Sequence, residues 1–294
     1  MAEQIAESEL IINERGAVYH LDMRPDELAP TIITVGDPGR VPKVSKHFDR
    51  ILSHSAHREF VWDTGIIGNK KLTVLSTGIG PDNIDIALNE LDALANIDFA
   101  TREIKPECRV LNIIRMGTCG GLQPDIPTDG LVASSHGIGL DNLLRYYAFD
   151  QRPEEQALLT AFLQHTGLER RRIYPYLAEG SGSLLRLFAE AGIPTGITAT
   201  CPGFYGPQGR RLRISPTFGD LPERMTTFRH GTLRITNFEM ETAAIFGLGR
   251  LMGHRCMAVN TVVANRTTGT FSKDNNRAIE HMIEEALTLL VEGL

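Results

Sequence analysis

The sequence predicts a layered α/β fold, on the basis of three observations. Short β-branched runs, such as residues 31–35, alternate along the chain with longer segments whose apolar residues recur at helical spacing. The 28 glycines among the 294 residues gather in short clusters, several of them directly after an apolar run. Such clusters suit the tight turns that follow strands. Because strands and helices alternate, we expect helices packed against one sheet.

In the first half of the chain, the expected strands are short apolar runs, and the first three of them end in glycine-rich loops. Strands are expected at residues 31–35, 72–76, 110–114 and 131–134, and the loops after the first three at 36–39, 77–80 and 115–121. A helix is expected at residues 41–48. Another is expected at residues 81–94, where Ile84, Leu88 and Leu91 share one face.

The second half continues the alternation. Amphipathic helices are expected at residues 153–165 and 184–191, and helices also at residues 241–252 and 273–290. Strands are expected at residues 196–200 and 256–264, and residues 215–229 are expected as a loop. Residues 1–18 form a polar N-terminal lead-in. No linker, repeat or low-complexity tract divides the rest, so we expect one domain over residues 19–294.

Charge and cysteine usage exclude several classes of function. The net charge is −6, and the densest basic stretch, Arg210–Arg213, is too short for a nucleic-acid surface, so no nucleic acid is expected as partner. The four cysteines lie far apart without a Cys-x-x-Cys pair, which favours reduced thiols over a zinc site or disulfides. No signal peptide or bilayer-spanning run is recognisable, so a cytoplasmic enzyme without membrane contact is expected.

Three loops offer candidate anion-binding groups. Gly36 ends the first strand and Arg40 follows four residues later, which suits a phosphate but equally a plain turn. Arg115 closes an apolar run ahead of Thr118, at a depth where its charge needs either a bound anion or a buried carboxylate. Arg58 follows His57 and could equally form a surface ion pair. The sequence contains neither a P-loop nor a G-x-G-x-x-G fingerprint, which argues against nucleotide triphosphates and dinucleotides.

Two carboxylates flank a methionine at an expected strand-to-helix junction, in Glu239-Met240-Glu241. Acidic residues are favoured at helix N-termini, so a structural role explains them. The alternative is a carboxylate that grips sugar hydroxyls, with methionine against the sugar face, and these residues alone favour the structural role.

The motifs together resemble one family. The ordered series GDPGR, HREF, STGIG, RMGTCGG, FYGPQGR, NFEMET and VVANRT resembles the uridine phosphorylases of the nucleoside phosphorylase family. The resemblance runs from Tyr19 to the end of the last helix. It implies a single α/β domain around a central mixed, partly closed β-sheet flanked by helices. It also implies a pentosyltransferase (EC 2.4.2.3) that needs no cofactor or metal and takes inorganic phosphate as co-substrate.

The resemblance implies a role for each matching residue. Phosphate-binding residues would be Gly36, Arg40, Arg115 and Thr118, with Arg58 supplied by a neighbouring subunit. Ribose-binding residues would be Glu239, Met240 and Glu241, with His20 reaching the 5′ end from the partner chain and Tyr19 as an aromatic lining residue. Base-binding residues would be Phe204, Gln208, Arg210 and Arg266. The expected assembly is a homodimer with shared active sites, with a hexamer of three dimers left open.

The base end of the site predicts a pyrimidine nucleoside, uridine or deoxyuridine. The side-chain amide of Gln208 can pair with N3–H and a carbonyl of uracil, while Arg210 donates to O4. Purine-cleaving relatives usually have Ser-Asp where this chain has Ala264-Asn265. A purine or broad-specificity phosphorylase, a nucleosidase and a silent nucleoside-binding protein remain alternatives.

The sequence also departs from the family pattern. Asn83 stands where a serine in some relatives helps to hold a monovalent cation, so no such ion is expected. The sequence leaves open whether Cys119, beside the expected phosphate loop, is reactive.

Overall fold

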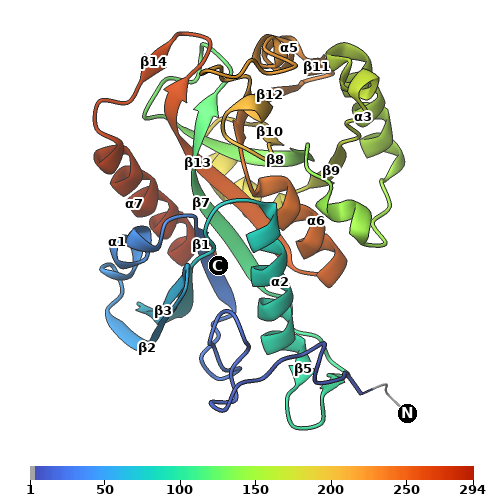
Figure 1. The fold of residues 1–294 in the computed structure, drawn as a ribbon. Coiled ribbons are helices and arrows are strands. Elements are labelled where there is room, and N and C mark those ends of the chain that lie inside the picture. The colour runs from blue at the N-terminus through green and yellow to red at the C-terminus, as the bar shows by residue number, and fades with distance from the viewer. Residues whose placement is uncertain (1–3) are drawn as a thin grey trace.

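One mixed sheet forms the centre of the molecule, and helices cover both of its faces (Figure 1). The computed structural model describes residues 4–294. The longer strands are β1 (Thr31–Val35), β2 (Arg50–His57), β3 (Phe60–Ile67), β4 (Lys70–Ser76), β7 (Asn112–Gly121), β8 (Leu131–Gly139), β9 (Tyr176–Glu179), β10 (Thr195–Thr200), β12 (Leu233–Glu239) and β13 (Arg255–Asn265). The two-residue strands are β5 (Ile97–Asp98), β6 (Glu103–Ile104), β11 (Arg229–His230) and β14 (Thr270–Phe271).

The α-helices are α1 (Val41–Ser45), α2 (Pro81–Asn96), α3 (Pro153–Thr166), α4 (Gly182–Glu190), α5 (Leu221–Thr227), α6 (Thr242–Met252) and α7 (Asn275–Gly293). Single 3₁₀ turns, η1 (Pro38–Arg40), η2 (Leu143–Tyr146), η3 (Leu168–Arg171) and η4 (Gly206–Gln208), lie between them.

The strand order explains why the sheet is partly closed. The main path runs β11-β12-β10-β8-β13-β7-β1-β4-β3-β2. Near its end, β12 also pairs with the end of β7, so that the strands from β7 through β13, β8 and β10 return to β12. β1, β4, β7 and β13 run parallel. Their carboxyl ends therefore lie at one edge, which is where open α/β sheets bind ligands. The predicted mixed, partly closed α/β fold is confirmed.

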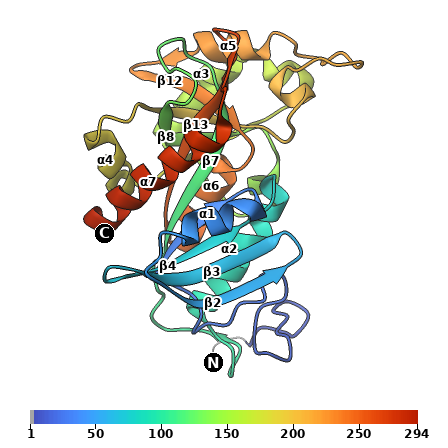
Figure 2. The same ribbon diagram turned by 90° about the vertical axis from the view of Figure 1, so that its left-hand side faces the viewer.

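The core forms two layers, one on each face of the central strands. Neighbouring residues of a strand face opposite sides of a sheet. Ile32 and Ile113 accordingly join the apolar cluster under α2 and α6, while Ile33 and Ile114 join the cluster under α1 and α7. Figure 1 shows these two helix pairs on opposite sides of β1 and β7, and Figure 2 shows α4 and α7 on the same face. Burial on both faces explains the apolar runs by which these strands were predicted.

Most expected elements are present with shifted ends, and several regions differ. The helix expected at residues 41–48 ends at Ser45, and residues 215–229, expected as a loop, contain α5. The β2–β3 hairpin was not predicted. β2 is an edge strand whose residues are all exposed or half-buried, so its sequence carries no apolar pattern. Patterns of burial can reveal only those strands that the fold buries.

The stretch at residues 115–121 was expected to be a loop but is the second half of β7, paired with β13 throughout. Its glycines are needed because neighbouring side chains pack closely against the strand, and not because the chain turns here. A Cβ on Gly117 would lie 2.2 Å from Oδ1 of Asn260, and one on Gly120 would lie 2.4 Å from the ring of Phe238. Glycine within a strand commonly marks such a close approach. Arg115 is therefore fixed within a strand instead of on a loop.

The described part of the N-terminal lead-in packs against the domain. Leu10, Ala17 and Val18 are buried, and the guanidinium of Arg102 donates to the backbone carbonyl of Ile5. Within residues 4–294, no helix combines the length and the apolar character that crossing a membrane requires.

Candidate active site

A cavity of about 660 Å³ opens where the carboxyl ends of β1, β4, β7, β12 and β13 meet. This volume falls in the range of roughly 300–1,000 Å³ typical of small-molecule sites. Ten of the residues predicted from the motifs line it: Gly36, Arg40, Arg115, Thr118, Phe204, Gln208, Arg210, Glu239, Met240 and Glu241. The sheet thus brings together segments that lie up to two hundred residues apart in the sequence.

One end of the cavity is cationic. η1 follows β1 directly and carries Arg40, whose Nη1 donates to the carbonyl of Met116 at 3.2 Å. Burial, and then the neighbouring guanidinium of Arg115, lower the pKa of Arg40 to about 10, which leaves it charged at neutral pH. A Cβ on Gly36 would lie 3.7 Å from Nη2 of Arg115. The absence of a side chain at Gly36 therefore keeps space open beside the two arginines, where an anion can lie.

Next to this end, Arg115 is paired with two carboxylates. Its Nη2 forms a buried salt bridge with Oε2 of Glu241, and its Nε lies 3.5 Å from Oε2 of Glu239. Of the two explanations that the sequence allowed for the buried charge, the structure shows the carboxylate. Nε and Nη1 of Arg115 are both buried without a hydrogen-bond partner within residues 4–294. Nε still faces the carboxylate of Glu239, which leaves Nη1 as the donor that has no acceptor nearby.

The two carboxylates are held differently. Glu239 accepts hydrogen bonds from the backbone N–H groups of Glu241 and Thr242, both at 2.9 Å, and from the hydroxyl of Thr200 at 2.7 Å. Glu239 therefore accepts hydrogen bonds from the backbone at the N-terminus of α6, which is the structural role that acidic residues have at helix N-termini. Glu241 instead accepts from the N–H of Gly80 at 2.9 Å and faces the cavity.

The proton affinity of Glu241 reflects its burial. Desolvation raises its pKa above the ordinary value of 4.5, and the nearby charge of Glu239 raises it further, while Arg115 opposes both effects. Burial of a carboxylate beside another carboxylate disfavours the charged form. A ligand that offers hydroxyl groups to Glu241 would replace part of the hydration that burial removes.

The opposite end of the cavity carries an amide and a guanidinium on the loop around η4. Oε1 of Gln208 accepts a hydrogen bond from Nη1 of Arg210, which also donates to the carbonyl of Phe204 at 2.7 Å. The guanidinium lies 3.7 Å from the centre of the Phe204 ring, a cation–π contact. Arg266 lies behind this loop and donates to the carbonyl of Gln208 at 3.3 Å, so it supports the loop rather than lining the cavity.

His20 and Arg58 do not line the cavity of their own chain. They lie together near the β2–β3 turn, where the guanidinium of Arg58 lies 5.7 Å from the centre of the Tyr19 ring. The carbonyl of His20 is 3.0 Å from Nδ1 of His57. Nδ1 of His20 is 2.7 Å from a carboxylate oxygen of Glu90, which fixes the ring. That both side chains act in a neighbouring subunit stays a prediction.

Several cavity residues were not assigned a role from the sequence, namely Asp37, Glu59, Ile79, Asn83, Phe238 and Phe271. Glu59 and Phe238 belong to motifs that the sequence analysis singled out, so their position beside predicted site residues could have identified them. Phe271 lies in β14, outside every motif, and nothing in the sequence around it indicated a place in the cavity. Cys119, also on the cavity wall, has a buried thiol whose pKa is raised by that burial, which keeps the thiol protonated.

A second cavity, of about 720 Å³, lies beside the loop that carries Gln208 and shares Arg210 with the first. Its lining is mostly apolar, with Leu140, Leu168 and Phe218 among the wall residues, and no carboxylate belongs to the described lining. Arg210 and Arg213 give this lining positive charge, but it offers no carboxylate to hold sugar hydroxyls beside an anion. The smaller cavity at the strand ends is therefore the candidate active site.

Comparison with known proteins agrees with this geometry. The family model described as "Phosphorylase superfamily" matches residues 30–293. The chain belongs to the phosphorylase superfamily. A uridine phosphorylase of Thermococcus kodakarensis is 28% identical over 296 residues, covering 99% of this chain and 93% of its own. One from Escherichia coli is 26% identical, covering 93% and 98%.

A solved structure extends the similarity to the fold. A Trypanosoma brucei nucleoside phosphorylase, described as showing uridine phosphorylase activity, superposes with a TM-score of 0.88 at 31% identity, covering 96% of this chain and 99% of that one. A DeoD-type purine nucleoside phosphorylase of Geobacillus kaustophilus is 26% identical, covering 93% and 98%. This member of the phosphorylase superfamily is therefore a nucleoside phosphorylase, an enzyme of the pentosyltransferase class.

Proposed function

We propose that the enzyme cleaves uridine with inorganic phosphate, releasing uracil and ribose 1-phosphate, in pyrimidine nucleoside salvage or catabolism. The observation that carries this proposal is the order of groups along one cavity. Two buried arginines lie at one end, a buried carboxylate follows, and an amide paired with a guanidinium occupies the other end. That order matches phosphate, ribose and a base that offers both donors and acceptors.

The cationic end would take the phosphate. Arg40 is charged and makes one hydrogen bond to protein, leaving further donors of its guanidinium free for an anion. Nη1 of Arg115 adds a buried donor, Thr118 adds a hydroxyl, and Gly36 leaves the space open. Arg58 of a partner subunit would complete the site. Burial, and then the Arg115 guanidinium, lower the pKa of Arg40, and a bound anion would offset both effects.

Glu241 would hold the ribose hydroxyls, with Met240 against the sugar face and His20 of a partner subunit at the 5′ end. Glu239 contributes by fixing the backbone of Glu241, and Arg115 contributes by orienting its carboxylate. Arg115 would therefore contact both reactants, phosphate through Nη1 and the sugar-binding carboxylate through Nη2. This double contact aligns the phosphate with the sugar, which is the main part of the catalytic advantage that positioning gives.

The base end favours a pyrimidine. The pairing of Gln208 with Arg210 leaves the Nε2 amide hydrogens of Gln208 free to donate to a uracil carbonyl, while Arg210 can donate to O4. Phe204 would pack on the ring. A purine phosphorylase needs an acid that protonates N7. Ala264 lines the cavity at the corresponding place, and the amide of Asn265 donates to the backbone carbonyls of Gln123 and Ile126 instead.

The reaction follows from where charge develops. As the glycosidic bond lengthens, the ribose gains positive charge, which the bound phosphate stabilises. The uracil ring gains negative charge, which Gln208 and Arg210 stabilise through hydrogen bonds that strengthen in the transition state. Each fixed donor of this type is worth about 3 kcal/mol in comparable sites. These residues can perform the reaction without a metal or an organic cofactor.

The decisive experiment offers pure protein uridine, deoxyuridine, thymidine and inosine, each with and without inorganic phosphate, and separates the products. We expect uracil and ribose 1-phosphate from uridine only when phosphate is present. Equal uracil release without phosphate would identify a nucleosidase instead. Faster turnover of inosine would make the enzyme a purine or broad-specificity phosphorylase, and tight uridine binding without product would identify a silent binding protein.

A further inference from the structure

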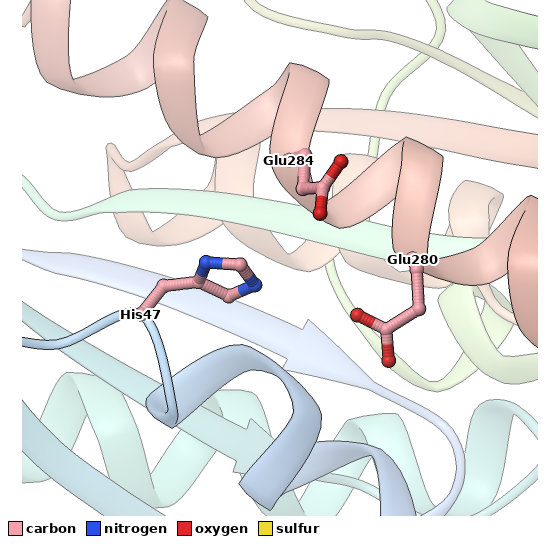
Figure 3. A group of neighbouring side chains, drawn as sticks. All are labelled: His47, Glu280 and Glu284. Atoms are coloured by element: carbon pink, nitrogen blue, oxygen red, sulfur yellow. The ribbon is translucent and has the colours of Figure 1, made fainter.

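A second group of ionisable side chains lies on the opposite side of the molecule from α2 and α6, between the end of α1 and α7. Nitrogen of His47 and carboxylate oxygens of Glu280 and Glu284 all lie within 4.8 Å of one another. Glu280 and Glu284 are four residues apart on α7, so they project from one face of the helix. Figure 3 shows the imidazole ring of His47 pointing toward the space between these two carboxylates.

His47 supplies an observation independent of the two acids. Its Nε2 is buried and has no hydrogen-bond partner within the part of the chain that the structure describes. A buried ring nitrogen without a partner costs free energy that a ligand can offset. A cavity of about 360 Å³ lies against His47, Glu284 and Thr288, so that there is room for an ion and bound water.

The existing contacts of the three side chains leave carboxylate oxygens available to a metal ion. Nζ of Lys46 lies 2.5 Å from Oε2 of Glu280, but the Lys46 side chain is half exposed and such pairs contribute little stability. The other oxygen of Glu280 remains available, and no hydrogen bond from within residues 4–294 reaches the carboxylate of Glu284.

We propose that His47, Glu280 and Glu284 bind one divalent transition-metal ion of the zinc type, which fastens α7 to the segment that follows α1. One imidazole and two carboxylates are ligands that such an ion accepts, with water completing the coordination. Tetrahedral ligands at about 2.1 Å from zinc lie about 3.4 Å from one another. The side chains must therefore approach by roughly 1 Å, which rotation of the half-buried Glu280 and the exposed Glu284 on the helix surface allows. This ion has a structural role and takes no part in phosphorolysis.

The test measures Zn²⁺ binding to the full chain after removal of metal with a chelator and dialysis. Isothermal titration calorimetry should give one Zn²⁺ per chain in the wild-type protein. His47→Gln and Glu284→Gln should each weaken this affinity by roughly tenfold or more, as the loss of a ligand does. His281→Gln and Glu285→Gln are matched controls on the same helix, and both should bind as the wild type does.

A second readout separates this site from adventitious binding to surface histidines. Saturating Zn²⁺ should raise the melting temperature of the wild type by a few degrees, because the ion binds the folded state. It should not do so in His47→Gln, while the phosphorolytic activity of His47→Gln should equal that of the wild type. Wild-type protein that binds no Zn²⁺, or His47→Gln that binds as tightly as His281→Gln, overturns the proposal.

Discussion

Arg115 and Glu241 form the buried pair on which the chemistry of the cavity depends. Neither side chain reaches solvent to any extent, and a third charge, that of Glu239, lies beside them. Two carboxylates and one guanidinium leave a net negative charge, which the nearby guanidinium of Arg40 offsets. Removal of one member of a buried pair typically costs 3–5 kcal/mol of folding stability. A substitution of Arg115 would therefore lower both the stability of the fold and the activity, and the two effects could not be separated. Arg40 is the better residue to change.

Arg40→Gln should specifically impair the use of phosphate. The substitution removes the charge but leaves the strand and η1 intact, because the one side-chain hydrogen bond of Arg40 within residues 4–294 goes to the carbonyl of Met116. We expect kcat/KM for phosphate to fall by roughly 10²-fold, the usual cost of losing one fixed donor to developing charge. Arg211→Gln, a change at an exposed position, serves as control. Steady-state kinetics with varied phosphate would contradict this assignment if both variants behaved as the wild type.

The raised pKa of Glu241 predicts how activity depends on pH. If the ionised carboxylate holds the ribose hydroxyls, activity is lost as pH falls and the group takes up a proton. Because burial raises this pKa above 4.5, the loss begins at a higher pH than for an ordinary glutamate. The pH profile of kcat/KM for uridine measures it, since that parameter reports groups of the free enzyme. His20→Asn should keep this acid limb, and its disappearance in that variant would assign the limb to His20.

The four cysteines should differ sharply in reactivity. Cys108 is exposed, whereas burial raises the pKa values of Cys119, Cys201 and Cys256 and keeps those thiols protonated. Because the thiolate is the reactive species, native protein should show one rapidly reacting thiol with a disulfide reagent at pH 8. Cys108→Ser should abolish that rapid phase. A rapid phase that persists in Cys108→Ser would show that one of the three buried thiols is accessible.

At the scale of elements, β7 is the strand that assembles the site. It supplies Arg115 and Thr118, pairs with β1 over its first four residues and with β13 along its length, and meets β12 at its end. The strand can pass so close to its neighbours because glycines occupy the crowded positions. The crossing with β12 brings Glu239 and Glu241 to Arg115, although more than a hundred residues separate them.

Gly117→Ala tests the requirement for close packing in β7. The added Cβ would lie 2.2 Å from Oδ1 of Asn260, inside a sheet that has little room to relax. We expect a loss of about 1–3 kcal/mol in the free energy of unfolding, the usual cost of overpacking. Gly182→Ala is the control, because nothing lies within 4 Å of its added Cβ at the start of α4. Denaturant unfolding of both variants decides, and equal stabilities would show that β7 can shift aside.

At the scale of the whole molecule, the cavity of one chain lacks the two residues that the family resemblance places there. His20 and Arg58 gather at the β2–β3 turn, outside the cavity lining of their own chain. If two chains exchange these groups, each active site combines the cavity of one chain with His20 and Arg58 of the other. A symmetric dimer arranges contacts in this reciprocal way.

Complementation between two impaired variants tests this exchange. Arg40→Ala and Arg58→Ala should each show little phosphorolytic activity alone. In a dimer of one chain of each kind, one site combines both defects and the other is intact. Co-expressed variants that assort at random should therefore recover roughly a quarter of wild-type activity. Mixtures that remain as inactive as the separate variants would show that Arg58 acts within its own chain or takes no part.

The sequence by itself determined the fold class, most of the central strands and ten of the residues that line the cavity. β1 and the helix α2 could be predicted because buried strands are continuous apolar runs and half-buried helices keep a regular period. Gly36, Arg40 and Gln208 could be named because their motifs keep a characteristic order along the chain. Local patterns of this kind can be recognised in the sequence because each depends on residues only a few positions apart.

Only the tertiary structure decided how those residues contact one another. No local pattern reveals that Arg115 pairs with Glu241, that Glu239 serves the start of α6, or that Arg266 lies behind the loop carrying Gln208. The edge strand β2 and the glycine-rich end of β7 were misjudged for the same reason. Their conformations depend on partners far away in the sequence, and long-range pairing leaves no periodic signal in the strand itself.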